Sequence, residues 1–278
     1  MEDLKELYEK KKYTALEKAC QKAESAGSAD FTVYLYHACT QMARSNFSRF
    51  TAAQGISMFQ KARELSQGQT AAQKQLYELF AEAVLQAVAR YESTFSSVSM
   101  TNEIVEAYRN SMQQAADALC ETVSLGEVLE LSDAEAGKDV LSLKKMAVHC
   151  MVELCQVRKY EVDMGKAISK RTNNAPENIR VTYGEKYDRL VQEIQAVDAG
   201  YEPEPIQREH VAAEEANACQ LKLPPEGEAA GTTAAADPQA QTAGAAKGTD
   251  AAGQKHPDAA DPGTASKGFL GWLKGLFS

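Results

Sequence analysis

Proline is nearly absent from the first part of the chain, where Pro176 is the only proline that precedes Pro203. A proline inside a helix costs about 3 kcal/mol, so a long proline-free segment rich in Ala, Leu, Glu, Lys and Gln favours helices. Alternating runs of β-branched residues, which would indicate strands, are also missing. The sequence therefore predicts an all-α fold without a sheet.

Further absences narrow the class of protein and its compartment. The 30 Lys and Arg residues are outnumbered by 39 Asp and Glu residues, which disfavours broad nucleic-acid binding because that requires a surface that neutralises phosphates. The N-terminus lacks the apolar core of a signal peptide, and no segment is long enough to span a bilayer. The 6 cysteines form no CxxC pair and fit buried, reduced thiols. We therefore expect a cytoplasmic protein.

The usual catalytic and metal-binding motifs are missing too, because the chain contains no GxSxG, no HExxH and no glycine-rich phosphate loop. Three groupings contain metal-ligand residue types: His37 with Cys39, His149 with Cys150, and Glu78 with Glu82. Residues one or two apart on a helix point in different directions, and the glutamates lack the ExxH partners of helical metal sites. We expect no enzymatic activity, no cofactor and no metal, with the two glutamates on a solvated helix edge.

Apolar spacing and capping residues predict about eight antiparallel helices. Their starts are expected near residues 2, 14, 30, 51, 70, 101, 132 and 176, with a capping box at Thr14–Glu17 and caps at Asp30 and Thr101. The stripes of the long helices define a predicted core that contains Phe80, Tyr108, Leu143, Met151, Leu154, Leu190 and Ile194.

The seventh helix is predicted to be the longest, from a Ser132–Glu135 capping box to about Lys170. Lys145, Lys159, Lys166 and Lys170 lie fourteen, seven and four residues apart, near one stripe of that helix. Such a row is usually a solvated face. The alternative is a secondary basic stripe that contacts acidic lipid headgroups.

Residues 4–27 contain a short helix, a turn that ends in Tyr13, an Ala-Leu pair and a second helix with small residues at Ala19 and Ala23. This pattern resembles a tetratricopeptide repeat, and residues 34–67 resemble a looser second copy. The resemblance implies a helical-repeat module for protein-protein interaction. Since no proline ends the repeat and the later helices are too long for a 34-residue period, both an antiparallel bundle and a short α-solenoid remain open.

A change of composition after Tyr201 predicts the domain organisation. From Pro203 to Ser266 the chain is rich in Ala, Gly, Pro and Thr, contains no aromatic residue, and cannot bury enough apolar surface to offset its ordering entropy. We therefore expect a helical domain over 1–201, a disordered linker over 202–266 and an amphipathic helix over 267–278.

The last residues, GFLGWLKGLFS, sort into two faces when wound at about 100° per residue. The apolar arc holds Phe269, Leu270, Trp272, Leu273, Leu276 and Phe277, and Lys267 and Lys274 lie beside it. The segment resembles the membrane-targeting helices of Min-system and actin-like bacterial division proteins. That resemblance implies insertion of the apolar residues into lipid, with the two lysines near headgroups.

Together these observations predict a non-enzymatic protein-interaction or adaptor module that is held peripherally at the inner face of a membrane. Its expected partners are the membrane surface and an unidentified protein, with no nucleic acid. One alternative is a soluble adaptor whose C-terminal helix docks into a hydrophobic groove on a partner or on its own domain. A second is a helical enzyme without a recognisable motif.

Overall fold

The computed structural model describes residues 3–131, 137–165, 167–212 and 220–221. The chain divides into two compact units, 1–221 and 222–278, and the second unit lies outside the described residues. The described part contains eight helices and a small antiparallel sheet. The predicted helical class is confirmed, whereas the prediction that no sheet forms is wrong.

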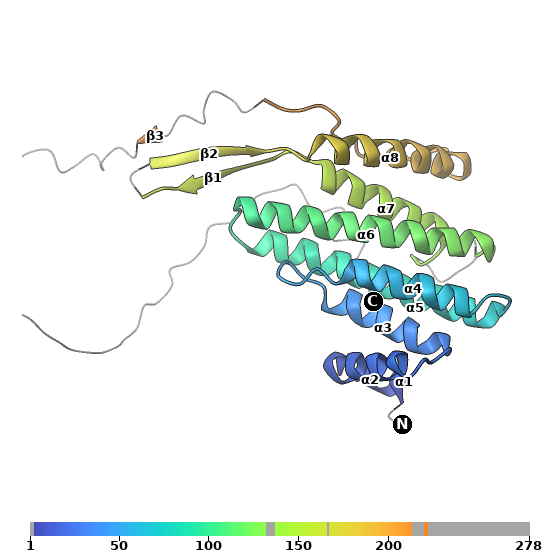
Figure 1. The fold of residues 1–278 in the computed structure, drawn as a ribbon. Coiled ribbons are helices and arrows are strands. Elements are labelled where there is room, and N and C mark those ends of the chain that lie inside the picture. The colour runs from blue at the N-terminus through green and yellow to red at the C-terminus, as the bar shows by residue number, and fades with distance from the viewer. Residues whose placement is uncertain (1–2, 132–136, 166, 213–219, 222–278) are drawn as a thin grey trace, which may run out of the picture. The chain divides into compact units, whose positions relative to one another are not determined.

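The elements follow one another along the chain as Figure 1 shows. The helices are α1 (Leu4–Glu9), α2 (Tyr13–Ser25), α3 (Phe31–Arg44), α4 (Ala52–Leu65), α5 (Thr70–Ser97), α6 (Asn102–Val128), α7 (Val140–Cys155) and α8 (Glu177–Val197). The strands are β1 (Arg158–Asp163), β2 (Ala167–Asn173) and β3 (Gln220–Leu221).

Two of the predicted caps form as expected. The Asp30 carboxylate accepts a hydrogen bond from the Thr32 amide at 2.9 Å, and the Thr101 hydroxyl accepts one from the Ile104 amide at 3.3 Å. Each bond satisfies a backbone donor that has no partner within its helix, so these side chains define the starts of α3 and α6.

The capping box predicted at Thr14–Glu17 is wrong. Helix α2 already begins at Tyr13, and the residue before it makes no side-chain cap. The Glu17 carboxylate instead binds Arg44 and, at 2.9 Å, Arg49. The long-range ion pairs therefore replace the local bond, because two cations lie within reach of this glutamate in the folded chain.

The segment between residues 132 and 170 differs most from its prediction. The Ser132–Glu135 box lies outside the described residues, and α7 begins after Asp139, whose carboxylate accepts from the Ser142 amide at 2.9 Å. The helix ends at Cys155 instead of continuing to Lys170. The longest helix of the described part is α5.

A β-hairpin follows α7. Strands β1 and β2 pair antiparallel from Arg158 opposite Asn173 to Asp163 opposite Ile168, and β3 pairs with the start of β2. Gly165 in the connecting turn has a φ of 81°, a conformation that glycine adopts without steric cost. Half-buried and exposed side chains alternate along β1, as expected for a strand with one face toward the protein.

The hairpin separates the four lysines that were expected to share one helix. Lys145 lies on α7, Lys159 on β1 and Lys170 on β2, and Lys166 lies outside the described residues. The stripe on a single helix is therefore wrong, because its spacing was read with the period of a helix where the chain forms strands.

The apolar core lies between sequential helices. Helix α6 packs against α5 and α7, α7 packs against α8, and α3 packs against α2, α4 and α5. All seven predicted core residues are buried: Phe80, Tyr108, Leu143, Met151, Leu154, Leu190 and Ile194. The helical phases inferred from the sequence are thus confirmed.

The chain beyond the predicted domain end at 201 makes specific contacts with the domain. Ile206 is buried, and the Tyr187 hydroxyl donates to the Glu204 carbonyl at 2.7 Å. The amide of Val211 donates to Asn174 Oδ1 at 2.9 Å. Residues 203–211 therefore form part of the packed unit.

Two helical glycines should respond in opposite ways to replacement by alanine. A Cβ at Gly126 of α6 would lie 2.5 Å from Tyr77 Cε2 and 2.8 Å from Val140 Cγ2. One at Gly184 of α8 would meet only the Arg208 side chain, with Nη1 at 3.4 Å and Cζ at 3.7 Å. Gly126→Ala should lower the free energy of unfolding by about 1–3 kcal/mol through overpacking. Gly184→Ala should raise it by up to about 1 kcal/mol through helix propensity.

Urea unfolding followed by far-UV circular dichroism measures both changes. Equal stabilisation by the two substitutions would show that the space beside Gly126 is larger than the structure indicates.

Candidate functional site

A pocket of about 410 Å³ opens between α1, α2, α3 and α5. We call it the tyrosine pocket. It is lined by Lys5, Tyr8, Glu9, Lys11, Tyr13, Tyr36, Gln75, Glu78, Leu79, Glu82 and Gln86. The pocket therefore combines aromatic rings with carboxylates, side-chain amides and two lysines.

Three tyrosines from three helices form its aromatic wall. The Tyr8 ring lies edge-on to Tyr13, with centroids 6.2 Å apart, and tilts against Tyr36 at 5.6 Å. Lys11 has a φ of 54° and lies in the turn that joins α1 to α2. The turn thus places two tyrosines, five residues apart in sequence, on the same wall.

Helix α5 supplies the polar wall. Gln75, Glu78, Glu82 and Gln86 are three or four residues apart and so share one face of the helix. Glu82 accepts from Gln86 at 3.1 Å and from Lys138 at 3.3 Å. Glu78 forms no ion pair or hydrogen bond within the described residues, so its carboxylate stays available to a ligand.

Glu78 and Glu82, which the sequence analysis expects not to bind a metal, both belong to this polar wall. Among the described residues, no group of three or more His, Cys, Asp or Glu side chains is placed to hold a metal ion. The two carboxylates and the three tyrosine rings instead line one pocket, a combination suited to an organic cation.

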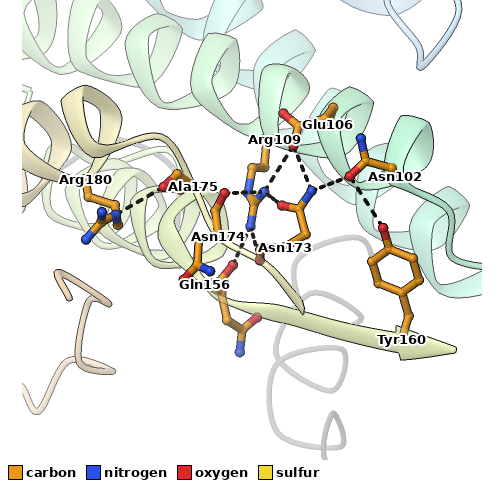
Figure 2. Close-up of polar contacts among 9 residues, drawn as sticks. All are labelled: Asn102, Glu106, Arg109, Gln156, Tyr160, Asn173, Asn174, Ala175 and Arg180. Atoms are coloured by element: carbon orange, nitrogen blue, oxygen red, sulfur yellow. Dashed lines mark hydrogen bonds and ion pairs between the residues drawn. The ribbon is translucent and has the colours of Figure 1, made fainter. Parts of the chain in front are cut away.

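A second polar cluster surrounds Arg109 of α6, which is 3% exposed (Figure 2). Its Nη2 donates to the carbonyls of Gln156 at 2.9 Å and Asn173 at 3.0 Å. Its Nη1 donates to the Asn174 carbonyl at 3.2 Å and to Asn173 Oδ1. Burial lowers the pKa of Arg109, and Glu106, at 3.4 Å, opposes that shift.

The asparagines extend this cluster to neighbouring segments. Asn173 Nδ2 donates to Asn102 at 2.7 Å and to Glu106 at 3.0 Å. Asn174 exchanges two hydrogen bonds with the backbone of Val211, at 3.0 Å and 2.9 Å. The Arg109 cluster therefore joins α6 to the end of α7, the base of the hairpin and the segment after α8. Because Arg109 donates to three backbone carbonyls, the cluster is a structural anchor.

The two His-Cys groupings do not form sites. His37 Nδ1 lies 2.5 Å from Glu24, and its Nε2 lies 2.8 Å from Gln41. Cys39 Sγ donates to the Leu79 carbonyl at 3.6 Å, away from His37. Each group thus has its own partner within the core.

His149 contacts Glu92 at 2.6 Å through Nε2, while the adjacent Cys150 is buried. Burial opposes the charge of His149, but the hydrogen bond and attraction of Glu92 outweigh it and raise the pKa of His149. This pair links α5 to α7 and serves packing.

The residues predicted to meet a membrane are only partly described. Lys145 forms an ion pair with Asp198 at 2.8 Å and lies over the Tyr201 ring, so it already has partners within the domain. The remaining predicted contacts lie outside the described residues: Lys166, Lys267, Phe269, Leu270, Trp272, Leu273, Lys274, Leu276 and Phe277.

Sequence reasoning missed the tyrosine pocket and the Arg109 cluster. The sequence signal for the pocket is the polar face of α5, which holds Glu78 and Glu82. Its aromatic wall comes from residues far away in sequence, and no local pattern relates them to α5.

The helices of the described part do not include one that combines the length and apolarity needed to cross a bilayer. No protein-family model, curated protein or solved structure matches the chain.

Proposed function

We propose that this chain is a non-enzymatic protein-interaction module held at the cytoplasmic face of a membrane by its C-terminal helix. The observation that carries the interaction role is the tyrosine pocket. Tyrosine rings supply large contact area and polar edges, which is why aromatic residues are enriched at binding interfaces. The resemblance of residues 4–27 to a tetratricopeptide repeat supports the same role.

The membrane attachment rests on the six apolar side chains of the last residues. Fully buried, each would contribute about 1.5–3 kcal/mol, which gives a gross upper bound of roughly 9–18 kcal/mol. Interfacial burial is partial, and ordering the backbone costs about 1–2 kcal/mol per residue. The expected attachment is therefore weak and reversible, and a second contact strengthens it.

The single tryptophan of the chain reports directly on this attachment. When the full chain meets anionic lipid vesicles, Trp272 fluorescence should shift to the blue as the ring leaves water. Leu273→Asp places a charge on the apolar arc and should abolish both the shift and co-sedimentation with the vesicles. Lys274→Gln removes one headgroup contact and should weaken binding modestly, mainly at low salt.

A second outcome separates lipid binding from docking onto protein. If vesicles leave the spectrum unchanged while the peptide 267–278 binds tightly to one purified protein, the membrane part of the proposal is overturned. The groove-docking alternative then replaces it.

A further inference from the structure

We propose that the tyrosine pocket binds an arginine side chain presented by an extended segment of a partner protein. This inference rests on the proposed interaction function and names the ligand chemistry of its site. It is argued from the aromatic wall, the α5 carboxylates and the size of the pocket.

The aromatic wall suits a flat cation. The Tyr8 ring centroid lies 6.2 Å from that of Tyr13 and 5.6 Å from that of Tyr36, and each of the three tyrosines lines the pocket. A guanidinium group is attracted by aromatic faces and also stacks on them, because it is planar and weakly hydrated. An ammonium group lacks that stacking.

Helix α5 supplies hydrogen-bond acceptors to the same pocket. Glu78 forms no ion pair within the described residues, and one helical turn away Glu82 binds Gln86 and Lys138. A guanidinium presents five donors in a planar fork that matches a carboxylate through two parallel bonds. Glu78 is therefore the carboxylate that we assign to the arginine.

Tyr36 adds an independent observation. This residue is 95% buried, its exposed fraction being 5%, and it lines the pocket, yet its hydroxyl makes no hydrogen bond within the described residues. The hydroxyl oxygen itself is open to solvent in the pocket, so a ligand can reach it. A guanidinium N–H group that does not bind the Glu78 carboxylate can donate a hydrogen bond to this oxygen.

The rim and the volume point to a peptide segment. Lys5 is paired with Glu9 at 3.8 Å, while Lys11 is exposed at the edge of the pocket, where it can donate to a backbone carbonyl of the ligand. A volume of about 410 Å³ exceeds that of one side chain. The pocket thus has room for the arginine and for part of its flanking backbone.

The test uses the full chain, labelled with ¹⁵N, and two peptides that differ by a single group. Ac-Gly-Gly-Arg-Gly-Gly-NH₂ carries the cation, and the same peptide with citrulline in place of arginine has nearly the same shape without charge. Amide shifts of Tyr8, Tyr13 and Glu78 should saturate with the arginine peptide. The citrulline peptide should bind at least ~10-fold more weakly, because it loses the charge-assisted pair.

Two variants test whether Glu78 and Tyr13 contact the arginine side chain. Glu78→Gln should weaken binding of the arginine peptide about tenfold, and Tyr13→Leu should weaken it severalfold. Glu185→Gln on the exposed face of α8 changes the net charge equally and should leave binding unchanged. Circular dichroism checks that each variant remains folded, which the exposure of Glu78 favours.

Equal binding of the two peptides, shifts confined to residues outside the pocket, or an unaltered affinity of Glu78→Gln would each overturn the arginine assignment. The vesicle experiment stays separate, since it depends on Trp272 and Leu273 alone. If the arginine peptide does not bind but the chain still binds vesicles, the arginine assignment is rejected and the proposed membrane attachment stands.

Discussion

Replacing Arg109 by methionine is expected to lower the free energy of unfolding by about 3 kcal/mol or more. Hydrogen bonds to a charged group contribute about 1.5–3 kcal/mol each, and this guanidinium donates to the carbonyls of Gln156, Asn173 and Asn174. Methionine fills the volume of the side chain but satisfies none of these acceptors. The loss should therefore exceed that of an ordinary surface substitution.

The region that loses protection from hydrogen exchange in this variant identifies the role of the Arg109 cluster. Hydrogen exchange should accelerate most in β1 and β2, because Arg109 contacts both ends of the hairpin, at Gln156 before it and Asn173 at its close. Arg109→Lys should recover little, since an ammonium cannot reproduce the fork. Arg189→Met on α8 is the matched control, because its ion pair with Glu193 is exposed and should contribute less than about 1 kcal/mol.

Urea unfolding supplies the energies, and exchange measured by mass spectrometry supplies the position. If the methionine variant unfolds at the same urea concentration as the parent, or if exchange rises uniformly, the Arg109 cluster does not anchor the hairpin.

The helical part of the fold could be predicted because its signals are local. The apolar stripes that contain Phe80 and Leu143, and the caps at Asp30 and Thr101, lie within single helices. A side chain on such a stripe is buried whichever neighbour covers it. For this reason the phases were predictable without knowledge of the packing.

The hairpin could not be predicted in the same way. Residues 159–163 alternate between charged and apolar or aromatic types over only a few positions, and the lysines around them also fit a helical period. In the folded chain the distant Arg109 binds the backbone at both ends of the segment, and this contact has no local signal. Long-range contacts of this kind override local propensity.

The tyrosine pocket illustrates a second limit. The face of α5 with Glu78 and Glu82 was visible as a polar stripe, but a polar stripe alone is typical of a solvated edge. Only the packing of α1 to α3 beside it brings Tyr8, Tyr13 and Tyr36 into one pocket with the carboxylates. No local pattern encodes that juxtaposition. The sequence alone therefore predicts a solvated helix edge and does not predict the pocket.

Replacing Phe80 by alanine should lower the free energy of unfolding by about 3–5 kcal/mol, the range typical of fully buried phenylalanines. Phe80 of α5 and Phe59 of α4 are both 0% exposed, and their rings stack with centroids 4.2 Å apart and planes at 19°. Truncating either ring leaves a cavity and also removes the favourable contact with the other. Phe50→Ala, at a position that is 43% exposed, is the control and should cost less than about 1 kcal/mol.

The double variant decides whether this stacked pair holds α4 against α5. If the rings interact as the structure indicates, the combined cost of Phe59→Ala and Phe80→Ala should be smaller than the sum of the single costs by about 0.5–1.5 kcal/mol. Urea unfolding of the four proteins in this cycle gives the coupling energy. Strict additivity would mean that the two rings do not contact each other. If Phe80→Ala costs no more than Phe50→Ala, Phe80 is not buried in the core as the structure indicates.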